Sequence, residues 1–141
     1  KYLIANNYKV LTYEDLKKMG NKNLKDIDLK NYNAVCLAPW MINSIKNLNF
    51  DMLINVASFQ EMEPMRVQNY LDILSPKVKK IIYLHNAKEG QALGEKNRFG
   101  VLKQTTREDY INYLSPYFDL AKERDSFQQK NASEQIFGRK L

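Results

Sequence analysis

Apolar and polar residues follow one another in short blocks along this chain. Brief apolar runs between polar residues are typical of strands inside a sheet. Such runs predict strands at 8–12, 34–38, 80–84, 117–124 and 134–140. A further run, Met52–Ile54, predicts a buried parallel strand within the stretch Phe50–Met62. This strand leads into a polar tail that extends from Asn55 to Glu61.

Helical spacing occurs between these runs. Behind Pro64, which suits the first position of a helix, apolar residues recur three and four positions apart as far as Leu74. Thr105 and Thr106 stand three residues before Glu108 and Asp109, a pattern that predicts overlapping capping boxes at the start of another helix.

The N-terminal part carries weaker helical signals. Thr12 precedes Asp15 by three residues, which predicts a short helix that ends before a C-cap glycine at Gly20. A short helix is expected at 40–45, after Pro39 ends the second strand, and residues 1–7 resemble the end of a helix.

This order of elements predicts an α/β fold with a mostly parallel sheet and an antiparallel hairpin at the C-terminus. The length of 141 residues suits a single domain over 1–141. Ligands of open α/β sheets bind outside the carboxyl ends of the strands. The tail 55–61 is therefore the first place to look for a site, although a plain polar exit loop would have the same composition.

Charge narrows the range of partners. The formal net charge is +6, and 27% of the residues are charged. The basic residues are scattered, with pairs such as Lys17-Lys18 and Lys79-Lys80 but no longer run, whereas a nucleic-acid footprint would be a clustered stripe. We expect a modest attraction for phosphate-bearing small molecules and no nucleic-acid partner.

The chain has one cysteine and one histidine. Cys36 lies in an apolar run and is expected to be buried, which suits a reducing compartment, and we expect the cytoplasm. A single histidine excludes sites with several histidine ligands, and we expect no metal site. No apolar run approaches the length of a membrane span, so we expect no membrane partner.

Several segments together resemble the second half of a class I S-adenosylmethionine-dependent methyltransferase. The stretch that begins Phe50-Asp51 resembles the fourth strand of that family, and 71–76 followed by 80–84 resembles its next helix and fifth strand. The segments 117–120 and 135–139 resemble the sixth and seventh strands. The resemblance implies a Rossmann-like sheet, with S-adenosylmethionine as the cofactor, of which this chain is the C-terminal portion.

Two motifs make the resemblance narrower. Leu37-Ala38-Pro39-Trp40, followed by Ser58-Phe59-Gln60-Glu61-Met62, is similar to sugar O-methyltransferases of bacteria. The chain departs from the family in two respects. It has no Gly-x-Gly, so the glycine-rich loop that cradles the cofactor is missing, and so is the acidic residue after the second strand that holds the ribose hydroxyls. The resemblance thus implies that the first two strands of the sheet are absent from this chain.

The resemblance also implies a set of cofactor contacts. Pro39 and Trp40 would lie at the adenine, although Trp40 could equally be a large core residue. Asn55, Ala57 and Ser58 would face the methionine part of the cofactor, where small side chains allow a close approach and a polar one could donate to its carboxylate.

The acceptor would meet a second set of residues. Methylation of a sugar hydroxyl needs a base near the attacking oxygen, and His85 or Glu61 could take that proton. Glu61 could instead cap the helix that begins at Pro64, and a lone histidine is more often structural. Gln60, Asn86 and Arg98 would bind a sugar or sugar-nucleotide substrate.

The sequence therefore predicts a S-adenosylmethionine-dependent O-methyltransferase that acts on a sugar hydroxyl. Because the glycine-rich loop is missing, a non-catalytic interaction module of the same fold remains the alternative.

Overall fold

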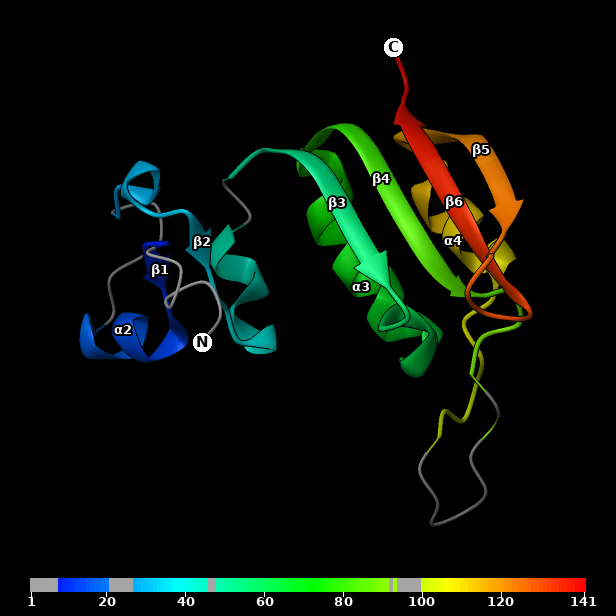
Figure 1. Ribbon diagram of the computed structural model, residues 1–141, viewed down its shortest axis with the longest axis horizontal. Coiled ribbons are helices and arrows are strands. Elements are labelled where there is room, and N and C mark those ends of the chain that lie inside the picture. The colour runs from blue at the N-terminus through cyan, green and yellow to red at the C-terminus, as the bar shows by residue number, and fades with distance from the viewer. Residues whose placement is uncertain (1–7, 21–26, 46–47, 92, 94–99) are drawn as a thin grey trace. The chain divides into compact units, whose positions relative to one another are not determined.

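A computed structural model describes residues 8–20, 27–45, 48–91, 93 and 100–141 (Figure 1). The chain divides into two compact units, Lys1–Leu48 and Asn49–Leu141, which are described separately. The predicted helix end at 1–7 lies outside the described residues.

The first unit is small. Strand β1 (Val10–Leu11) pairs in parallel with β2 (Ala34–Val35), and helix α2 (Tyr13–Lys18) lies between them in sequence. The predicted capping box of Thr12 and Asp15 begins α2 and is confirmed. Gly20 follows the helix at φ +69°, a left-handed conformation that glycine adopts without strain.

Short 3-10 helices complete this unit at Leu29–Asn31 and Pro39–Ile45. The second strand is shorter than predicted, because only Ala34 and Val35 pair with β1. The prediction that Cys36 is buried is wrong: the cysteine is exposed next to a strand of only two residues.

The second unit contains a four-stranded sheet in the order β3-β4-β6-β5. Its strands are β3 (Phe50–Val56), β4 (Val78–Ala87), β5 (Phe118–Asp125) and β6 (Ala132–Arg139). Strands β3 and β4 are parallel, whereas β6 is antiparallel to both of its neighbours. Three strands thus share one direction and β6 is reversed, which confirms the predicted α/β fold with a C-terminal hairpin.

Two helices, α3 (Pro64–Leu74) and α4 (Arg107–Leu114), lie on the same side of this sheet (Figure 1). Their apolar side chains join those of the strands in one core, in which Val67, Leu71 and Leu114 have no solvent exposure. Burial of each such side chain stabilises the fold by about 1.5–3 kcal/mol. The predicted helix behind Pro64 is confirmed, with proline in its first turn.

The opposite face of the sheet carries exposed apolar side chains on β3. Met52, Ile54 and Val56 are 48%, 61% and 53% exposed. Strand β3 also pairs on one side only within the described residues. The prediction of a parallel strand is confirmed, but the prediction that it is buried is wrong for the residues on this face. We call these three side chains the β3 stripe.

Strand β4 is longer than predicted. It continues through His85 and Asn86 to Ala87, because β6 pairs with it as far as Ala87 opposite Ala132. His85 and Asn86 therefore lie within a strand, with their side chains on opposite faces of the sheet. No helix in the described part of the chain is long and apolar enough to cross a membrane.

Candidate functional site

The carboxyl ends of β3 and β4 form one edge of the sheet. Val56, the last residue of β3, is the register partner of His85. The next residue, Ala57, turns the chain in the left-handed region at φ +58°, and its N–H donates to the His85 carbonyl at 2.8 Å. The polar tail of β3 is thus tied to the end of β4, as the parallel arrangement predicts.

Asn55 shapes the turn that follows β3. Its side chain is 8% exposed, its Nδ2 donates to Ser58 Oγ at 2.5 Å, and its Oδ1 accepts from the Phe59 N–H at 3.2 Å. Both ends of the carboxamide are therefore used within the turn. Ser58 is exposed, and its hydroxyl hydrogen remains available because its oxygen is the acceptor in that bond.

Gln60 joins the tail of β3 to the last residues of β4. It is 5% exposed, and its Oε1 accepts from the Ala87 N–H at 2.6 Å. Its backbone N–H donates to Asn86 Oδ1 at 3.4 Å, and its Nε2 donates to the exposed carboxylate of Glu61 at 3.3 Å. Gln60 thus fixes the loop and orients the neighbouring carboxylate.

Asn86 is buried, although it was predicted to contact a substrate. It is 3% exposed, and its Nδ2 has no hydrogen-bond partner among the described residues. A buried donor without a partner lowers the stability of a protein by about 1–3 kcal/mol. Where natural proteins keep such a donor, a water or a ligand often serves as its partner.

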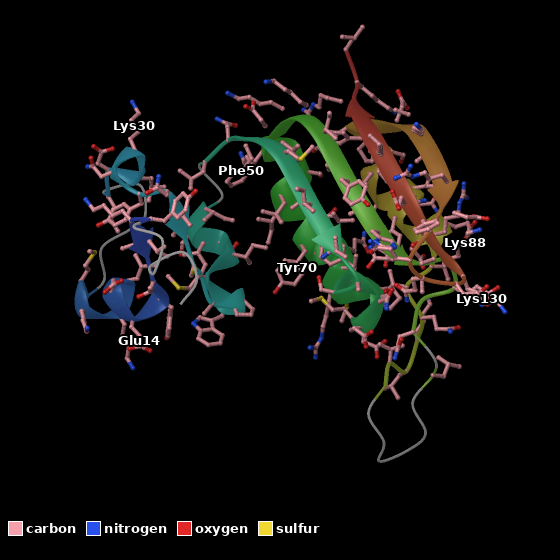
Figure 2. All side chains as sticks on the ribbon, viewed as in Figure 1. Glu14, Lys30, Phe50, Tyr70, Lys88 and Lys130 are labelled. Carbon is pink, nitrogen blue, oxygen red and sulfur yellow. The ribbon has the colours of Figure 1, made fainter. Side chains whose placement is uncertain are left out.

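His85 faces the other side of the sheet from Asn86. Its Nε2 lies 2.8 Å from Ser126 Oγ, which begins the turn between β5 and β6. Ser126 also lines a cavity of about 400 Å³, together with Lys88 and Lys130. Figure 2 shows these two lysines at the same end of the sheet. No described contact joins His85 to Glu61, so each is held by its own partners.

A group of polar side chains lies beside His85 on β4, β5 and β6. Glu134 is the register partner of His85, and Arg124 donates to its carboxylate from Nε at 2.9 Å and from Nη2 at 2.6 Å. These bonds lower the pKa of Glu134 below its ordinary value. Burial raises the pKa of Tyr83, which also contacts Glu134. Glu134 is therefore a charged group committed to Arg124.

Glu63, rather than Glu61, stands at the N-terminus of α3. Glu63 occupies the N-cap position, and its carboxylate accepts from the N–H groups of Leu102 at 2.6 Å and Lys103 at 3.1 Å. The alternative in which Glu61 caps this helix is thus wrong. Glu61 instead lines a small cavity of about 200 Å³ with Glu63 and Arg66.

The remaining predicted residues lie apart from this edge in the sequence. Pro39 and Trp40 begin a 3-10 helix of the first unit. Trp40 is 71% exposed and meets the Tyr13 ring edge-on at 5.7 Å, so the alternative of a core residue is wrong. Arg98 lies outside the described residues.

Three residues near the edge were not predicted: Ser126, Glu134 and Glu63. Ser126 and Glu134 reach the site through the hairpin, whose register the sequence does not reveal. Glu63 had a signal, since an acidic residue directly before a helical proline is a candidate N-terminal group. No group of three or more acidic, histidine or cysteine residues that could hold a metal ion occurs in the described part of the chain.

Comparison with known proteins gives matches among solved structures alone. No family model and no curated protein matches the chain. A S-adenosylmethionine-dependent methyltransferase from Clostridium acetobutylicum ATCC 824 is similar over 98% of this chain and 87% of its own, with 10% identity and a TM-score of 0.54.

Two further structures agree. Magnesium protoporphyrin IX methyltransferase from Synechocystis PCC 6803, with bound S-adenosylhomocysteine, is similar over 99% of this chain and 79% of its own (12% identity, TM-score 0.57). An N-methyltransferase from Bradyrhizobium japonicum WM9 is similar over 94% and 74% (11% identity, TM-score 0.52). At these identities the likeness concerns the fold: this chain has the fold of S-adenosylmethionine-dependent methyltransferases.

Proposed function

We propose that this chain is part of a S-adenosylmethionine-dependent O-methyltransferase that modifies a hydroxyl of a small sugar or sugar-nucleotide. The observation that carries the proposal is the edge formed by β3 and β4. There, a left-handed turn at Ala57 is followed by the exposed residues Ser58 and Glu61, three positions apart, on a sheet of the methyltransferase fold.

The residues at this edge fit the methionine part of the cofactor. Ala57 is small, and Ser58 keeps a hydroxyl hydrogen that could donate to a ligand carboxylate. Asn55 holds Ser58 in place, which makes it a support for the contact. Pro39 and Trp40 remain our proposed adenine contacts, and the exposed indole ring of Trp40 suits such a role.

Held at Asn55, Ala57 and Ser58, S-adenosylmethionine would supply the methyl group from its sulfonium to the acceptor oxygen and would leave as a neutral thioether. The protein has two tasks in such a transfer. It must hold the acceptor oxygen in line, which accounts for most of the acceleration, and it must accept the hydroxyl proton. Glu61 and His85 are the candidate bases, and Gln60 orients Glu61 through its Nε2.

The sugar acceptor rests on the segments Leu37–Trp40 and Ser58–Met62. Gln60 and Asn86 are predicted substrate contacts. Both are buried, and their amide oxygens accept from backbone N–H groups. We propose that they shape the acceptor site, and that the unpartnered Asn86 Nδ2 is the group most able to donate to a hydroxyl there.

Calorimetric titration of S-adenosylhomocysteine tests the proposal, both in this chain and in the longest protein its gene encodes. We expect binding that Ser58→Ala weakens severalfold, while the exposed control Ser115→Ala leaves it unchanged. If neither form binds, the proposal fails and the interaction module becomes the better account.

A further inference from the structure

The hydroxyl of Ser126 has three hydrogen-bonding neighbours. Besides the imidazole of His85 at 2.8 Å, its Oγ accepts from the backbone N–H groups of Gln128 at 3.2 Å and Gln129 at 3.0 Å. The Ser126 N–H also donates to the Ala132 carbonyl at 2.9 Å, which closes the turn between β5 and β6. The serine is therefore fixed at the base of this turn.

These contacts decide the direction of the bond to histidine. A hydroxyl offers two lone pairs and one hydrogen. The two backbone N–H groups occupy the lone pairs of Ser126, so its hydrogen is the group left for His85. The Nε2 of His85 must then accept, and a neutral imidazole that accepts at Nε2 carries its hydrogen on Nδ1.

We propose that Ser126 is a positioning residue that holds His85 as the neutral tautomer with hydrogen on Nδ1. In this form the accepting nitrogen of the ring is already occupied, and the other nitrogen can only donate. His85 would therefore donate from Nδ1 rather than take a proton. On the proposed function, Glu61 would then be the remaining candidate base for the acceptor hydroxyl.

Two carboxylates near this end of the sheet have cationic partners. Glu134, the register partner on β6, is engaged by two N–H groups of Arg124. Asp125, the residue before Ser126, forms an ion pair with Lys88 at 2.5 Å. Each of these carboxylates thus has a cation other than His85 as its hydrogen-bonded partner.

Nuclear magnetic resonance of the neutral protein can read the tautomer directly. His85 is the only histidine of the chain, so two-bond correlations between its ring protons and nitrogens give one unambiguous pattern. Spectra are recorded at a pH high enough that the chemical shifts of the His85 ring no longer change with pH, so that the ring is neutral. We expect hydrogen on Nδ1 in the wild type, and wild-type protein with hydrogen on Nε2 would overturn the inference.

Variants of Ser126 separate positioning from folding. Ser126→Ala removes the donated hydrogen, and the ring should change toward the tautomer with hydrogen on Nε2, whereas Ser126→Thr retains a hydroxyl and should keep the wild-type pattern. If Ser126→Ala keeps hydrogen on Nδ1 while folded, another group sets the tautomer and the inference fails.

The role of His85 as a donor rests on the proposed function, but its tautomer does not. The spectra need neither cofactor nor acceptor, whereas the calorimetric titration concerns cofactor binding alone. If the tautomer is as expected but neither this chain nor the longest protein binds S-adenosylhomocysteine, the methyltransferase proposal fails and the hydrogen-bond assignment stands.

Discussion

Three buried carboxamides organise the edge of the sheet at the residue scale. Asn55, Gln60 and Asn86 are each less than a tenth exposed, and all three bond to backbone N–H groups of the connecting loop or of β4. Their amides hold the loop, while the exposed residues between them, Ser58 and Glu61, are free to meet a ligand. This division separates the support of the site from its contacts.

Ala57 offers a test of this geometry. Its left-handed conformation costs a non-glycine residue about 1–2 kcal/mol, whereas the extra backbone freedom of glycine costs about 0.4–1 kcal/mol. We expect Ala57→Gly to raise the free energy of unfolding by about 0.5 kcal/mol, measured by urea denaturation. The matched change Ala87→Gly, at the end of β4, should lower it by a similar amount. A loss of stability in Ala57→Gly would contradict this account.

Tyr110 predicts a loss of stability in alkali. Its buried hydroxyl has no hydrogen-bond partner within the described residues, and burial raises its pKa. Above about pH 10 the unfolded chain loses this proton while the folded chain keeps it, so the free energy of unfolding falls as pH rises. Tyr110→Phe should reduce that fall and leave stability at neutral pH equal or up to about 1 kcal/mol higher.

Urea denaturation at neutral pH and at about pH 10.5 measures this effect. Tyr8→Phe, at a tyrosine that is 49% exposed, serves as the control. Some alkaline loss should persist in Tyr110→Phe because the pKa values of Tyr83 and Tyr113 are also raised by burial. An unchanged dependence on pH would show that Tyr110 ionises equally in both states.

At the scale of elements, side-chain hydrogen bonds join the start of α3 to the segment that precedes α4. Glu63 accepts two backbone N–H groups from 102–103, and Thr105 Oγ1 donates to the Met62 carbonyl at 2.8 Å. The next residue, Thr106, forms the capping box of α4 with Asp109. Of the two overlapping boxes that the sequence predicts, the one at Thr105 is wrong because its hydroxyl serves this tertiary bond.

Glu63→Ala should release the segment before α4. Charged hydrogen bonds of this kind contribute about 1.5–3 kcal/mol, so the amides of Leu102 and Lys103 should exchange with solvent roughly tenfold faster or more. Hydrogen exchange followed by mass spectrometry measures the change. Glu108→Ala removes an exposed carboxylate on α4 and should leave both amides as they are. If the amides of Leu102 and Lys103 exchange at the same rate in Glu63→Ala as in the wild type, the Glu63 contacts do not hold this segment.

Local patterns predict the helices well and the ends of strands poorly. Pro64 and the Thr106–Asp109 box mark their helices in the sequence itself. Strand β4 extends beyond the apolar residues that predict it, because its last residues pair with Ser133 and Ala132, which lie far along the chain. The position of Asn55, Ser58 and Gln60 directly after a strand also follows from a local sequence pattern. The contact of Ser126 with His85, 41 positions away, depends instead on the register of the hairpin.

At the scale of the whole molecule, the sheet of the second unit is covered on one face and open on the other. Residues of α3 and α4 fill the covered face, and the β3 stripe marks the open one. Parallel strands are usually buried on both faces, and natural edge strands usually carry charges, proline or bulges that prevent pairing. Strand β3 has a charge, Asp51, and a pairing irregularity between Phe50 and Met52, but both lie at its start. Ile54 and Val56 of the β3 stripe lie beyond them.

Ile54→Lys tests the open face. The side chain is 61% exposed, so the substitution should change the free energy of unfolding by no more than about 0.5 kcal/mol. A charge in the middle of the β3 stripe should, however, raise the protein concentration at which the chain self-associates, measured by sedimentation velocity. Phe127→Lys, at a fully exposed turn residue, is the matched control. An equal effect of both variants would mean that net charge, rather than the stripe, governs association.

The β3 stripe also determines how solution conditions act on the chain. Folding does not depend on protein concentration, but contact between two such stripes does, so dilution separates the molecules without altering the fold. Sulfate and phosphate, which strengthen apolar burial, should favour clustering, and cooling, which weakens it, should oppose clustering. A buffer chosen to stabilise the fold would then also favour association through this strand.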